Sequence, residues 1–424
     1  MKKKVLVFPC GSEIGLEIYS SVKNSLHFEL IGLSSVSDHG KFVYKNYIDG
    51  IGFYTDFNFL NKLKSVIEDH KIDILYPTMD SVISFLKKHS DYIKIPIVGP
   101  SVEVANLCAN KKETYSHLKN HIRVPKLYSD GEELKFPLFL KPIFGYGSRN
   151  AFKVENSKQL STLNLENNIL CEFLPGKEYT VDCFTGLDRE LLFVGARERI
   201  RTSNGISVNT KSDKELTKQF HSIAETINQH VNFIGAWFFQ LKNAEDGTPC
   251  LLEIACRFAG SSAIHRVLGV NFALANLYLI IGINPFFLIN EFDVESDRAL
   301  NSRFKLNISF ETVFIDYDDT IIIDGIINLE AIQFIFQCLN EKIKVILITK
   351  HKGSIFENLK YFKLLNLFDE VIHLTQNEEK TSSIRKFGYH NSIFIDDSFE
   401  ERRKVFEEFR IPVFSVDCFN SLIK

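Results

Sequence analysis

The sequence predicts a multidomain protein with α/β and α+β folds, and three observations lead to this class. The chain has 424 residues, more than the roughly 100–200 residues of a typical domain. Short apolar runs alternate with amphipathic stretches over residues 1–102, whereas residues 136–247 pair apolar runs with glycine turns. A second alternating series opens at residue 312. We therefore expect a parallel α/β domain over 1–102, a mixed domain over 103–304 and another parallel α/β domain over 305–424.

The composition is that of a globular protein with a packed core. Hydrophobic residues make up 45% of the chain and charged residues 24%, which excludes collagen-like and disordered classes. The formal net charge of −3 provides no broad positive field, so nucleic acid is not an expected partner.

The cysteines and the apolar segments predict a reduced, cytoplasmic protein without a membrane span. The eight cysteines include no CxxC pair, and we expect reduced, mostly buried thiols. No apolar stretch of signal length follows the basic residues Lys2–Lys4. Asparagines, glycines and Pro285 interrupt the uncharged segment Val267–Asn290, so we expect a buried helix with its following loop there.

The N-terminal region predicts a parallel sheet with a tight turn after its first strand. The apolar runs expected to form strands are Lys4–Pro9, Phe28–Leu33, Ile72–Pro77 and Ile95–Gly99. The spacing of apolar residues in Phe59–His70 predicts a helix. Gly11-Ser-Glu-Ile-Gly15 lacks the third glycine of a dinucleotide fingerprint, so we interpret it as a strand-to-helix turn.

The middle region predicts an antiparallel sheet layer. Its expected strands are Pro137–Lys141, Ala151–Val154, Ile169–Phe173, Tyr179–Phe184 and Leu191–Glu198. Arg197, Arg199 and Arg201 alternate, so on a strand they would share one face, either a solvated face or an anion site. We expect His265 on a helix surface and not as a catalytic base.

An ordered series of motifs runs through the middle region. Lys141 ends an expected strand and is followed by a loop with Gly145, Gly147 and Ser148. Glycines let backbone amides approach phosphate oxygens and a lysine supplies positive charge, although a glycine hairpin after a strand is also structurally ordinary. Lys111 stands in the first turn of an expected helix, where the helix dipole disfavours a cation. Further along the chain follow Glu172, Phe173, Leu174, Glu178, Gln240, Glu253 and Arg257.

This series resembles the ATP-grasp ligases, especially the branch akin to carbamoyl-phosphate synthase large subunits and other carboxylate–amine ligases. The resemblance implies a pre-ATP-grasp domain over 1–102, an ATP-grasp domain over 103–304 with a lid subdomain near 122–185, and ATP and Mg²⁺ as cofactors. The resemblance implies that Lys111 and Lys141 contact the phosphates and that a loop with Gly145, Gly147 and Ser148 lies over them. It implies that Glu172, Phe173 and Leu174 lie beside adenine and that Glu178 lies at the ribose. It also implies that Gln240 and Glu253 bind magnesium and that Arg257 lies at the transferred phosphoryl group.

The chain departs from the family pattern at one metal-binding position. Two residues after the glutamate the family has an asparagine, and this chain has Ala255. One oxygen ligand for magnesium is therefore missing, and water or ATP oxygens would have to replace it unless the enzyme is weakened.

The C-terminal region carries acidic residues at the ends of expected strands. Asp316 and Asp318 follow an apolar strand over Thr312–Ile315, and open α/β sheets place ligands at that edge. Further strands are expected at Val345–Thr349, Glu370–Leu374 and Ser392–Asp396. Lys380 and the pair Asp396 and Asp397 complete the series. Each motif alone has a structural alternative, since Asp-x-Asp can form a turn and Asp-Asp-Ser can cap a helix.

Together these residues resemble the haloacid-dehalogenase (HAD) superfamily. The resemblance implies a Rossmann-like domain with a minimal cap, because the segment between Thr320 and Thr349 is too short for a separate cap domain. The implied roles are Asp316 as the nucleophile, Asp318 as the general acid and base, Thr349 and Lys380 as ligands of the phosphoryl oxygens, and Asp316, Asp318, Asp396 and Asp397 as the magnesium-binding set.

The two resemblances together predict a bifunctional enzyme. An ATP-dependent ligase would join a small-molecule carboxylate to an amine, with a phosphorylated amine or a sugar-linked carboxylate among the options, and a fused phosphatase would then remove phosphate from the product. Two alternatives remain open: the phosphatase acts before ligation, or the ATP-grasp half is a weakly active nucleotide-binding regulatory module. The sequence specifies neither the two substrates nor the oligomeric state.

Overall fold

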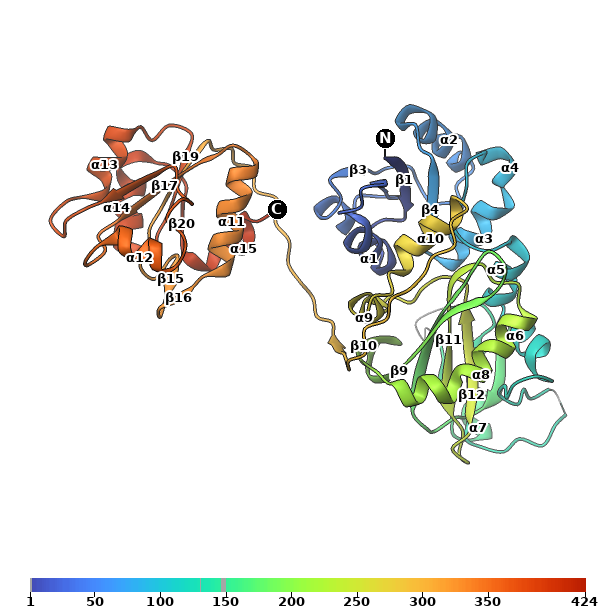
Figure 1. Ribbon diagram of the computed structural model, residues 1–424. Helices are drawn as coiled ribbons and strands as arrows, with labels where there is room; N and C mark the ends of the chain where they lie inside the picture. Colours follow the sequence, from blue (N-terminus) through green and yellow to red (C-terminus); the bar gives the residue numbers. More distant parts are fainter. Residues whose placement is uncertain (1, 130, 146–149) are drawn as a thin grey trace. The chain divides into compact units, whose positions relative to one another are not determined.

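The computed structural model describes residues 2–129, 131–145 and 150–424, and the chain forms two compact units (Figure 1). The first unit extends to Leu300 and the second from Asn301 to Lys424. The expected division of the first unit at residue 102 and the expected lid near 122–185 stay predictions.

A four-stranded parallel sheet begins the first unit, as expected, with the strand order β3-β2-β1-β4. The strands are β1 (Lys3–Phe8), β2 (Phe28–Leu33), β3 (Asn46–Ile48) and β4 (Ile74–Pro77). The apolar core places α1 (Glu13–Val22) and α10 (Phe272–Ile280) on one face and α2 (Phe59–His70) and α3 (Asp80–Lys88) on the other. Shorter helices are η1 (His39–Phe42), α4 (Ser90–Ile93), α5 (Val102–Ala109) and α6 (Lys111–Leu118).

The loop after β1 is the predicted strand-to-helix turn. Ser12 caps α1 by accepting a hydrogen bond from the backbone N–H of Gly15 at 3.0 Å. A Cβ atom on Gly15 would lie 2.3 Å from the carbonyl oxygen of Cys10, so this close approach requires glycine. The strand expected over Ile95–Gly99 is wrong, since only Ile97 forms a bridge, to Leu75. Proline at position 96 has no N–H to donate, which interrupts a regular ladder.

Two antiparallel sheets form the remainder of the first unit, and they confirm the expected antiparallel layer. The larger sheet has the order β12-β11-β8-β9-β10-β13 and the smaller the order β6-β5-β7. The strands are β5 (Leu138–Pro142), β6 (Phe152–Val154), β7 (Asn168–Glu172), β8 (Glu178–Thr185), β9 (Leu191–Ser203), β10 (Ile206–Ser212), β11 (Gly235–Asn243), β12 (Pro249–Ala255) and β13 (Glu295–Asp297). The helices are α7 (Ser157–Leu160), α8 (Lys214–His230) and α9 (Ala263–Val267).

Helix α8 covers one face of the larger sheet and leaves the other face for the polar residues. Phe220, Ala224 and Ile227 of α8 pack with the buried strand residues Val181 and Trp237. Because side chains alternate along a strand, the residues between those apolar positions point to the opposite face. That face carries Glu178, Gln240 and Glu253, the three motif residues that stand on strands of the larger sheet.

The uncharged segment and the cysteines behave as expected. Val267–Asn290 contains the buried helix α10 followed by a loop. Within the described part of the chain, no helix is both long and apolar enough to cross a membrane. All eight cysteines are free, and all except Cys418 are buried.

The second unit is a five-stranded parallel sheet with the order β18-β17-β14-β19-β20. Apolar side chains pack α11, α12 and α15 against one face and α13 and α14 against the other, and Figure 1 shows both layers. The strands are β14 (Thr312–Ile315), β17 (Lys344–Thr349), β18 (Glu370–His373), β19 (Ser392–Ile395) and β20 (Val413–Phe414). The helices are α11 (Leu329–Asn340), α12 (Ile355–Tyr361), α13 (Lys380–Phe387), α14 (Phe399–Phe409), η2 (Val416–Cys418) and α15 (Phe419–Leu422).

The chain between Thr320 and Thr349 holds only a small hairpin, helix α11 and strand β17. The hairpin strands are β15 (Ile322–Ile323) and β16 (Ile326–Ile327). This part of the described chain therefore contains no separate cap domain.

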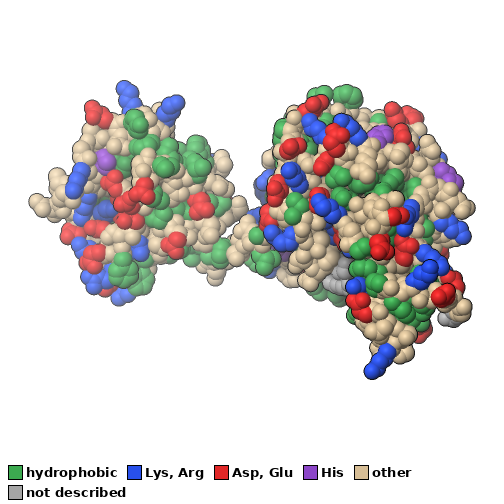
Figure 2. All heavy atoms as spheres, turned by 90° about the horizontal axis from the view of Figure 1, so that it is seen from below, with side chains coloured by type: hydrophobic (Ala, Val, Ile, Leu, Met, Phe, Trp, Pro, Cys, Tyr) green, Lys and Arg blue, Asp and Glu red, His purple; other side chains and the backbone are tan. Residues whose placement is uncertain are grey.

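The surface carries mixed charge. Figure 2 shows Lys and Arg side chains interspersed with Asp and Glu over the visible face of each unit. This distribution agrees with the small net charge of −3.

Two candidate active sites

The first candidate site is a cleft of about 130 Å³ in the first unit. The structure brings together in its lining eight residues that the motif series singled out. They are Lys111, Lys141, Glu172, Phe173, Leu174, Glu178, Gln240 and Glu253. Gly147 and Ser148, expected in the loop over the phosphates, lie outside the described residues.

Two oxygen-bearing side chains stand side by side in this cleft. Gln240 of β11 is directly opposite Glu253 of β12, next to an irregularity in the pairing of the two strands. Lys111 Nζ lies 4.0 Å from a carboxylate oxygen of Glu253 and donates a hydrogen bond to the carbonyl oxygen of Gly145 at 2.8 Å. Amide and carboxylate oxygens are suitable ligands for Mg²⁺, so the chemistry of this pair fits the implied metal.

Lys141 is a buried residue of the cleft lining. Its Nζ donates hydrogen bonds to the hydroxyl oxygen of Tyr115 at 2.5 Å and to the carbonyl oxygen of Leu252 at 3.4 Å. Burial lowers the pKa of Lys141 from its usual value. No carboxylate of the described residues lies within ion-pairing distance of this ammonium group, so its charge remains available to an anionic ligand.

Glu178 occupies the centre of a charged row across three strands. Lys242 Nζ lies 2.9 Å from one carboxylate oxygen of Glu178, and Arg199 Nε lies 3.3 Å from the other. Arg199 also donates a hydrogen bond to the carbonyl oxygen of Gly205, in the turn between β9 and β10, at 2.7 Å. Burial lowers the pKa of Arg199, which nevertheless stays charged because its usual value is so high.

Arg257 and Ala255 lie at the end of β12. The Arg257 guanidinium pairs with Asp80 at 2.8 Å and sits 5.5 Å from the ring centre of Phe238. Ala255 is buried in a small apolar cluster with Phe238 and Ala259. The position that carries asparagine in the resembled family is thus packed with apolar groups here.

Sequence reasoning missed three polar or aromatic residues of the cleft lining, namely Phe139, Arg199 and Lys242. Arg199 was considered only as one of three alternating arginines. Strand periodicity could have indicated the other two, because Phe139 stands two residues before Lys141 and Lys242 two residues after Gln240.

The structure corrects the expectations for His265 and for the arginines. His265 is buried, with Nε2 3.0 Å from Asp182 Oδ2, and does not lie on a helix surface. Gly195 allows this burial because a Cβ atom there would lie 2.6 Å from the His265 ring. The three alternating arginines do not form a fully solvated face. Arg197 is buried, and of the three only Arg201 is exposed.

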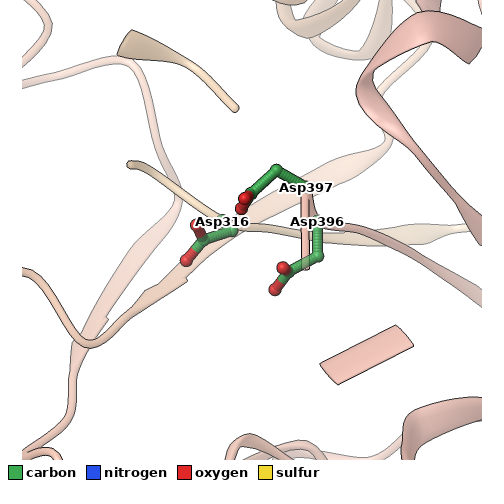
Figure 3. Close-up of side chains that lie close together, drawn as sticks. All are labelled: Asp316, Asp396 and Asp397. Carbon is green, nitrogen blue, oxygen red and sulfur yellow. The ribbon is translucent and has the colours of Figure 1, made fainter. Parts of the chain in front are cut away.

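The second candidate site lies at the carboxyl edge of the sheet in the second unit. Asp316 follows β14 and the pair Asp396 and Asp397 follows β19, and carboxylate oxygens of all three lie within 4.8 Å of one another (Figure 3). The neighbouring strands β14 and β19 flank the point where the strand order reverses, which is the usual ligand position in doubly wound sheets. Three carboxylates around one small space fit a hard divalent cation such as Mg²⁺.

Lys380 bridges two of these carboxylates. Its Nζ lies 2.5 Å from Asp316 Oδ1 and 2.7 Å from Asp396 Oδ2. Burial, assisted by the neighbouring Asp396, raises the pKa of Asp316 to about 7 despite the opposing effect of Lys380. Burial also raises the pKa of Asp396, and the two carboxylates outweigh burial in raising the pKa of Lys380. A bound cation would favour the ionised carboxylates.

Asp318 stands apart from the carboxylate cluster and has a partner that sequence reasoning missed. His351 Nδ1 lies 2.8 Å and 3.0 Å from the two oxygens of Asp318, whose side chain is half exposed. The backbone N–H of His351 donates to Thr349 Oγ1 at 3.1 Å, and His373 Nε2 bonds the His351 carbonyl oxygen at 2.9 Å. Asp318 does not belong to the group of carboxylates that could share one ion.

The structural alternative for Asp-Asp-Ser, a helix cap, is also present. Ser398 caps α14 by accepting a hydrogen bond from the N–H of Glu401, and Asp396 accepts one from the N–H of Ser398 at 2.8 Å. These bonds fix the direction of the Asp396 carboxylate.

Comparison with known proteins identifies the fold of the first unit. A family model described as "ATP-grasp in the biosynthetic pathway with Ter operon" matches residues 164–293. No curated protein sequence matches the chain.

Solved structures also resemble this chain in fold, at low sequence identity. The biotin carboxylase–β,γ-ATP complex from Campylobacter jejuni has a TM-score of 0.57 at 17% identity, covering 67% of this chain and 72% of that one. The biotin carboxylase domain of the Hydrogenobacter thermophilus 2-oxoglutarate carboxylase, solved with MgADP, ADP and bicarbonate, has a TM-score of 0.57 at 14% identity and coverages of 67% and 71%. An L-amino acid ligase from Bacillus licheniformis has a TM-score of 0.55 at 17% identity and coverages of 67% and 75%.

The chain therefore contains the ATP-grasp fold, which confirms that part of the prediction. The similarity of the second unit to the haloacid-dehalogenase superfamily stays a prediction.

Proposed function

We propose that this protein is a bifunctional enzyme, an ATP-dependent carboxylate–amine ligase fused to a magnesium-dependent phosphatase. The observation that carries the ligase half is the convergence of eight motif residues in one cleft, from Lys111 to Glu253. The observation that carries the phosphatase half is the cluster of Asp316, Asp396 and Asp397 with Lys380 between two of its members.

The ligase reaction has two steps. An oxygen of the substrate carboxylate attacks the γ-phosphorus of ATP, and the bond to the β-phosphate oxygen breaks to give an acyl phosphate and ADP. The nitrogen of the amine then attacks the acyl carbon, a C–N bond forms, phosphate leaves and the nitrogen gives up a proton. Such phosphoryl transfer depends on positioning and on neutralisation of charge.

The described residues supply these functions in the cleft. Lys111 and Lys141 attract the phosphate oxygens, and Arg257 stabilises the transferred group. Glu172, Phe173 and Leu174 border the adenine, while Glu178 accepts hydrogen bonds from the ribose. Gln240 and Glu253 would hold magnesium, which supplies charge neutralisation at the phosphates when bound. The nucleotide complexes of the two biotin carboxylase structures support ATP as the ligand of this fold.

The phosphatase reaction uses the residues of the second unit. An oxygen of Asp316 attacks the phosphorus of a phosphate ester, and the ester oxygen leaves with a proton from Asp318. Water then attacks the aspartyl phosphate, gives its proton to Asp318 and releases inorganic phosphate. Lys380 and Thr349 stabilise the phosphoryl oxygens. Asp316, Asp396 and Asp397 would hold magnesium, and Asp318, also expected as a ligand, acts as acid and base instead.

The proposal also includes an order for the two reactions. In the favoured order, the ligase joins a carboxylate to a phosphorylated amine and the phosphatase removes the phosphate afterwards. The reverse order would dephosphorylate a substrate before ligation. The phosphorylation state of the first product in a time course separates the two orders.

A second candidate function follows from Ala255. A first unit with a weakened metal site could act as a nucleotide-binding regulatory module. Incubation with ATP, Mg²⁺ and a pool of carboxylates and amines, scored by ADP release and product mass, tests the two functions. ADP release with a new amide supports the ligase, whereas ATP binding without ADP release supports the regulatory module.

A further inference from the structure

The two aspartates that follow β19 stand in a short loop between a strand and a helix. Strand β19 ends at Ile395 and helix α14 begins at Phe399, so the backbone groups between them need partners outside regular secondary structure. The N–H of Asp396 finds one on the neighbouring chain segment and donates to the carbonyl oxygen of Phe414 at 3.2 Å. The other backbone groups of Asp396 and Asp397 are bound by side chains.

Two side chains of the second unit hold this loop. Thr320 Oγ1 accepts a hydrogen bond from the N–H of Asp397 at 3.1 Å. Arg402 Nη1 donates to the carbonyl oxygen of Asp396 at 2.5 Å and to that of Asp397 at 2.7 Å. One guanidinium group therefore binds the main chain of both aspartates.

The place of Arg402 in its helix is unfavourable for a cation. It lies close to the N-terminus of α14, where the helix dipole favours acidic residues such as Glu400 and Glu401 of the first turn. The two carbonyl oxygens compensate for this position. A residue that departs from a local preference is expected at a functional site, so Arg402 is a candidate for a functional role.

Arg402 and Lys380 bind different atoms of the carboxylate cluster. Lys380 Nζ lies at carboxylate oxygens of Asp316 and Asp396, which are the atoms that a metal ion would use. Arg402 binds main-chain carbonyl oxygens and leaves those carboxylate oxygens to other partners. Lys380 therefore competes with a cation for its ligands, whereas Arg402 fixes the backbone from which Asp396 and Asp397 extend.

A fixed backbone matters because the three carboxylates of the cluster repel one another. Their oxygens lie within 4.8 Å, and like charges this close disfavour a shared site until a cation binds. Groups that orient metal ligands without touching the metal typically change its affinity by about 10–100-fold. The contacts of Arg402 are of this kind.

We propose that Arg402 is a positioning residue for the magnesium site of the second unit, and that it holds Asp396 and Asp397 in the arrangement that accepts the ion. This inference rests on the proposed phosphatase function and adds to it a residue outside the acidic motifs. It also assigns opposite effects to the two cations. Loss of Lys380 strengthens magnesium binding, whereas loss of Arg402 weakens it.

Two substitutions of Arg402 and one control test this role. Arg402→Met removes the charge and both hydrogen bonds, and Arg402→Lys keeps the charge on a shorter side chain without the guanidinium. The matched control is Arg403→Met at the next position, where the exposed guanidinium pairs with Glu400. All proteins are full chains that carry Glu253→Gln, which removes an expected magnesium ligand of the first unit. Magnesium binding then reports on the second unit.

Calorimetry with Mg²⁺ alone and the magnesium dependence of aryl phosphate hydrolysis measure the effect. We expect Arg402→Met to raise the Kd for Mg²⁺ by about 10–100-fold, Arg402→Lys to lie between Arg402→Met and the parent protein, and Arg403→Met to match the parent. Hydrolysis by Arg402→Met should require more Mg²⁺ and recover when Mg²⁺ saturates. A variant that only folds less well would instead lose maximal rate without a change in the Mg²⁺ requirement.

The outcomes separate this inference from the function on which it rests. Unchanged or tighter Mg²⁺ binding in Arg402→Met would overturn the positioning role and leave the phosphatase function standing, since tighter binding is the result expected from loss of charge alone. A lost maximal rate with an unchanged Mg²⁺ requirement would also overturn it. Absence of both Mg²⁺ binding and aryl phosphate hydrolysis from the parent protein would overturn the phosphatase function, and the inference with it.

Discussion

The ammonium group of Lys380 lies 2.5 Å from a carboxylate oxygen of Asp316, the residue to which we assign the nucleophilic role. The same group lies 2.7 Å from Asp396, so one lysine neutralises charge in a cluster of three carboxylates. Removal of this lysine should therefore have opposite effects on metal binding and on turnover.

Lys380→Met should bind Mg²⁺ more tightly and hydrolyse phosphate esters more slowly. Loss of the cation leaves the carboxylates with more net negative charge, while the phosphoryl oxygens lose a donor, an effect worth about 10²–10³ in kcat in comparable sites. Magnesium titration by calorimetry and steady-state kinetics measure the two effects. Lys386→Met, at an exposed position of the same helix, is the control. Wild-type turnover in Lys380→Met would contradict the assigned role.

His351→Ala should impair the departure of poor leaving groups. His351 holds both oxygens of Asp318, so its loss frees the proposed proton donor to rotate. General acid catalysis typically contributes about 10²–10⁴-fold, and an aryl phosphate needs it least. We expect His351→Ala and Asp318→Asn to retain a pre-steady-state burst with an aryl phosphate and to lose turnover of an alkyl phosphate.

The control for this prediction is His390→Ala, at an exposed position of the same unit. Asp316→Asn should show no burst with either substrate because it lacks the nucleophile. A burst from Asp316→Asn would overturn the assignment of the two aspartates.

Ala255→Asn should lower the magnesium concentration that the ligase requires. The new amide oxygen stands two residues after Glu253 and restores the ligand that the resembled family has. Because Ala255 is buried against Phe238 and Ala259, the larger side chain should also cost about 1–3 kcal/mol of stability. Ala255→Val, of similar bulk but without oxygen, separates the two effects. An unchanged magnesium requirement in Ala255→Asn would show that water or ATP already fills the position.

The lowered pKa of Lys87 predicts that the stability of the first unit depends on pH. Burial lowers its pKa to about 8 from 10.5, and the Cys256 thiol offsets only part of this effect. Between these two values the unfolded chain binds more protons than the folded chain, so stability rises with pH from 8 to 10.5. Lys87→Met should remove this rise and increase stability at pH 7 by about 1–3 kcal/mol.

The fluorescence of Trp237 can measure the effect of Lys87 on stability. It is the only tryptophan of the chain and is buried in the first unit, so its fluorescence follows the unfolding of that unit. Denaturant titrations at pH 7 and pH 10 compare the wild type with Lys87→Met and with Lys88→Met, an exposed control. An equal pH dependence in all three proteins would contradict the assigned pKa.

The sequence predicted the helices, the strands and the cleft residues better than it predicted which side chains contact one another. Strand runs such as Phe28–Leu33 are apolar because both sheet faces are covered, and this signal is local. Lys141 and Glu253 carry motif chemistry that can be recognised in order along the chain. In contrast, His265 pairs with Asp182, and His351 with Asp318, only through the fold. No periodicity in the sequence specifies such contacts, so His265 was misplaced and His351 was missed.

The central claim, two independent active sites in one chain, is tested most directly by measuring both activities in three proteins. ADP formation with ATP, Mg²⁺ and the substrate pool, and hydrolysis of an aryl phosphate, are measured for the wild type, Lys141→Ala and Asp316→Asn. The account predicts that Lys141→Ala loses ADP formation and keeps phosphatase activity, and that Asp316→Asn does the reverse. Loss of both activities in either folded variant, or ADP formation by Lys141→Ala at the wild-type rate, would contradict it.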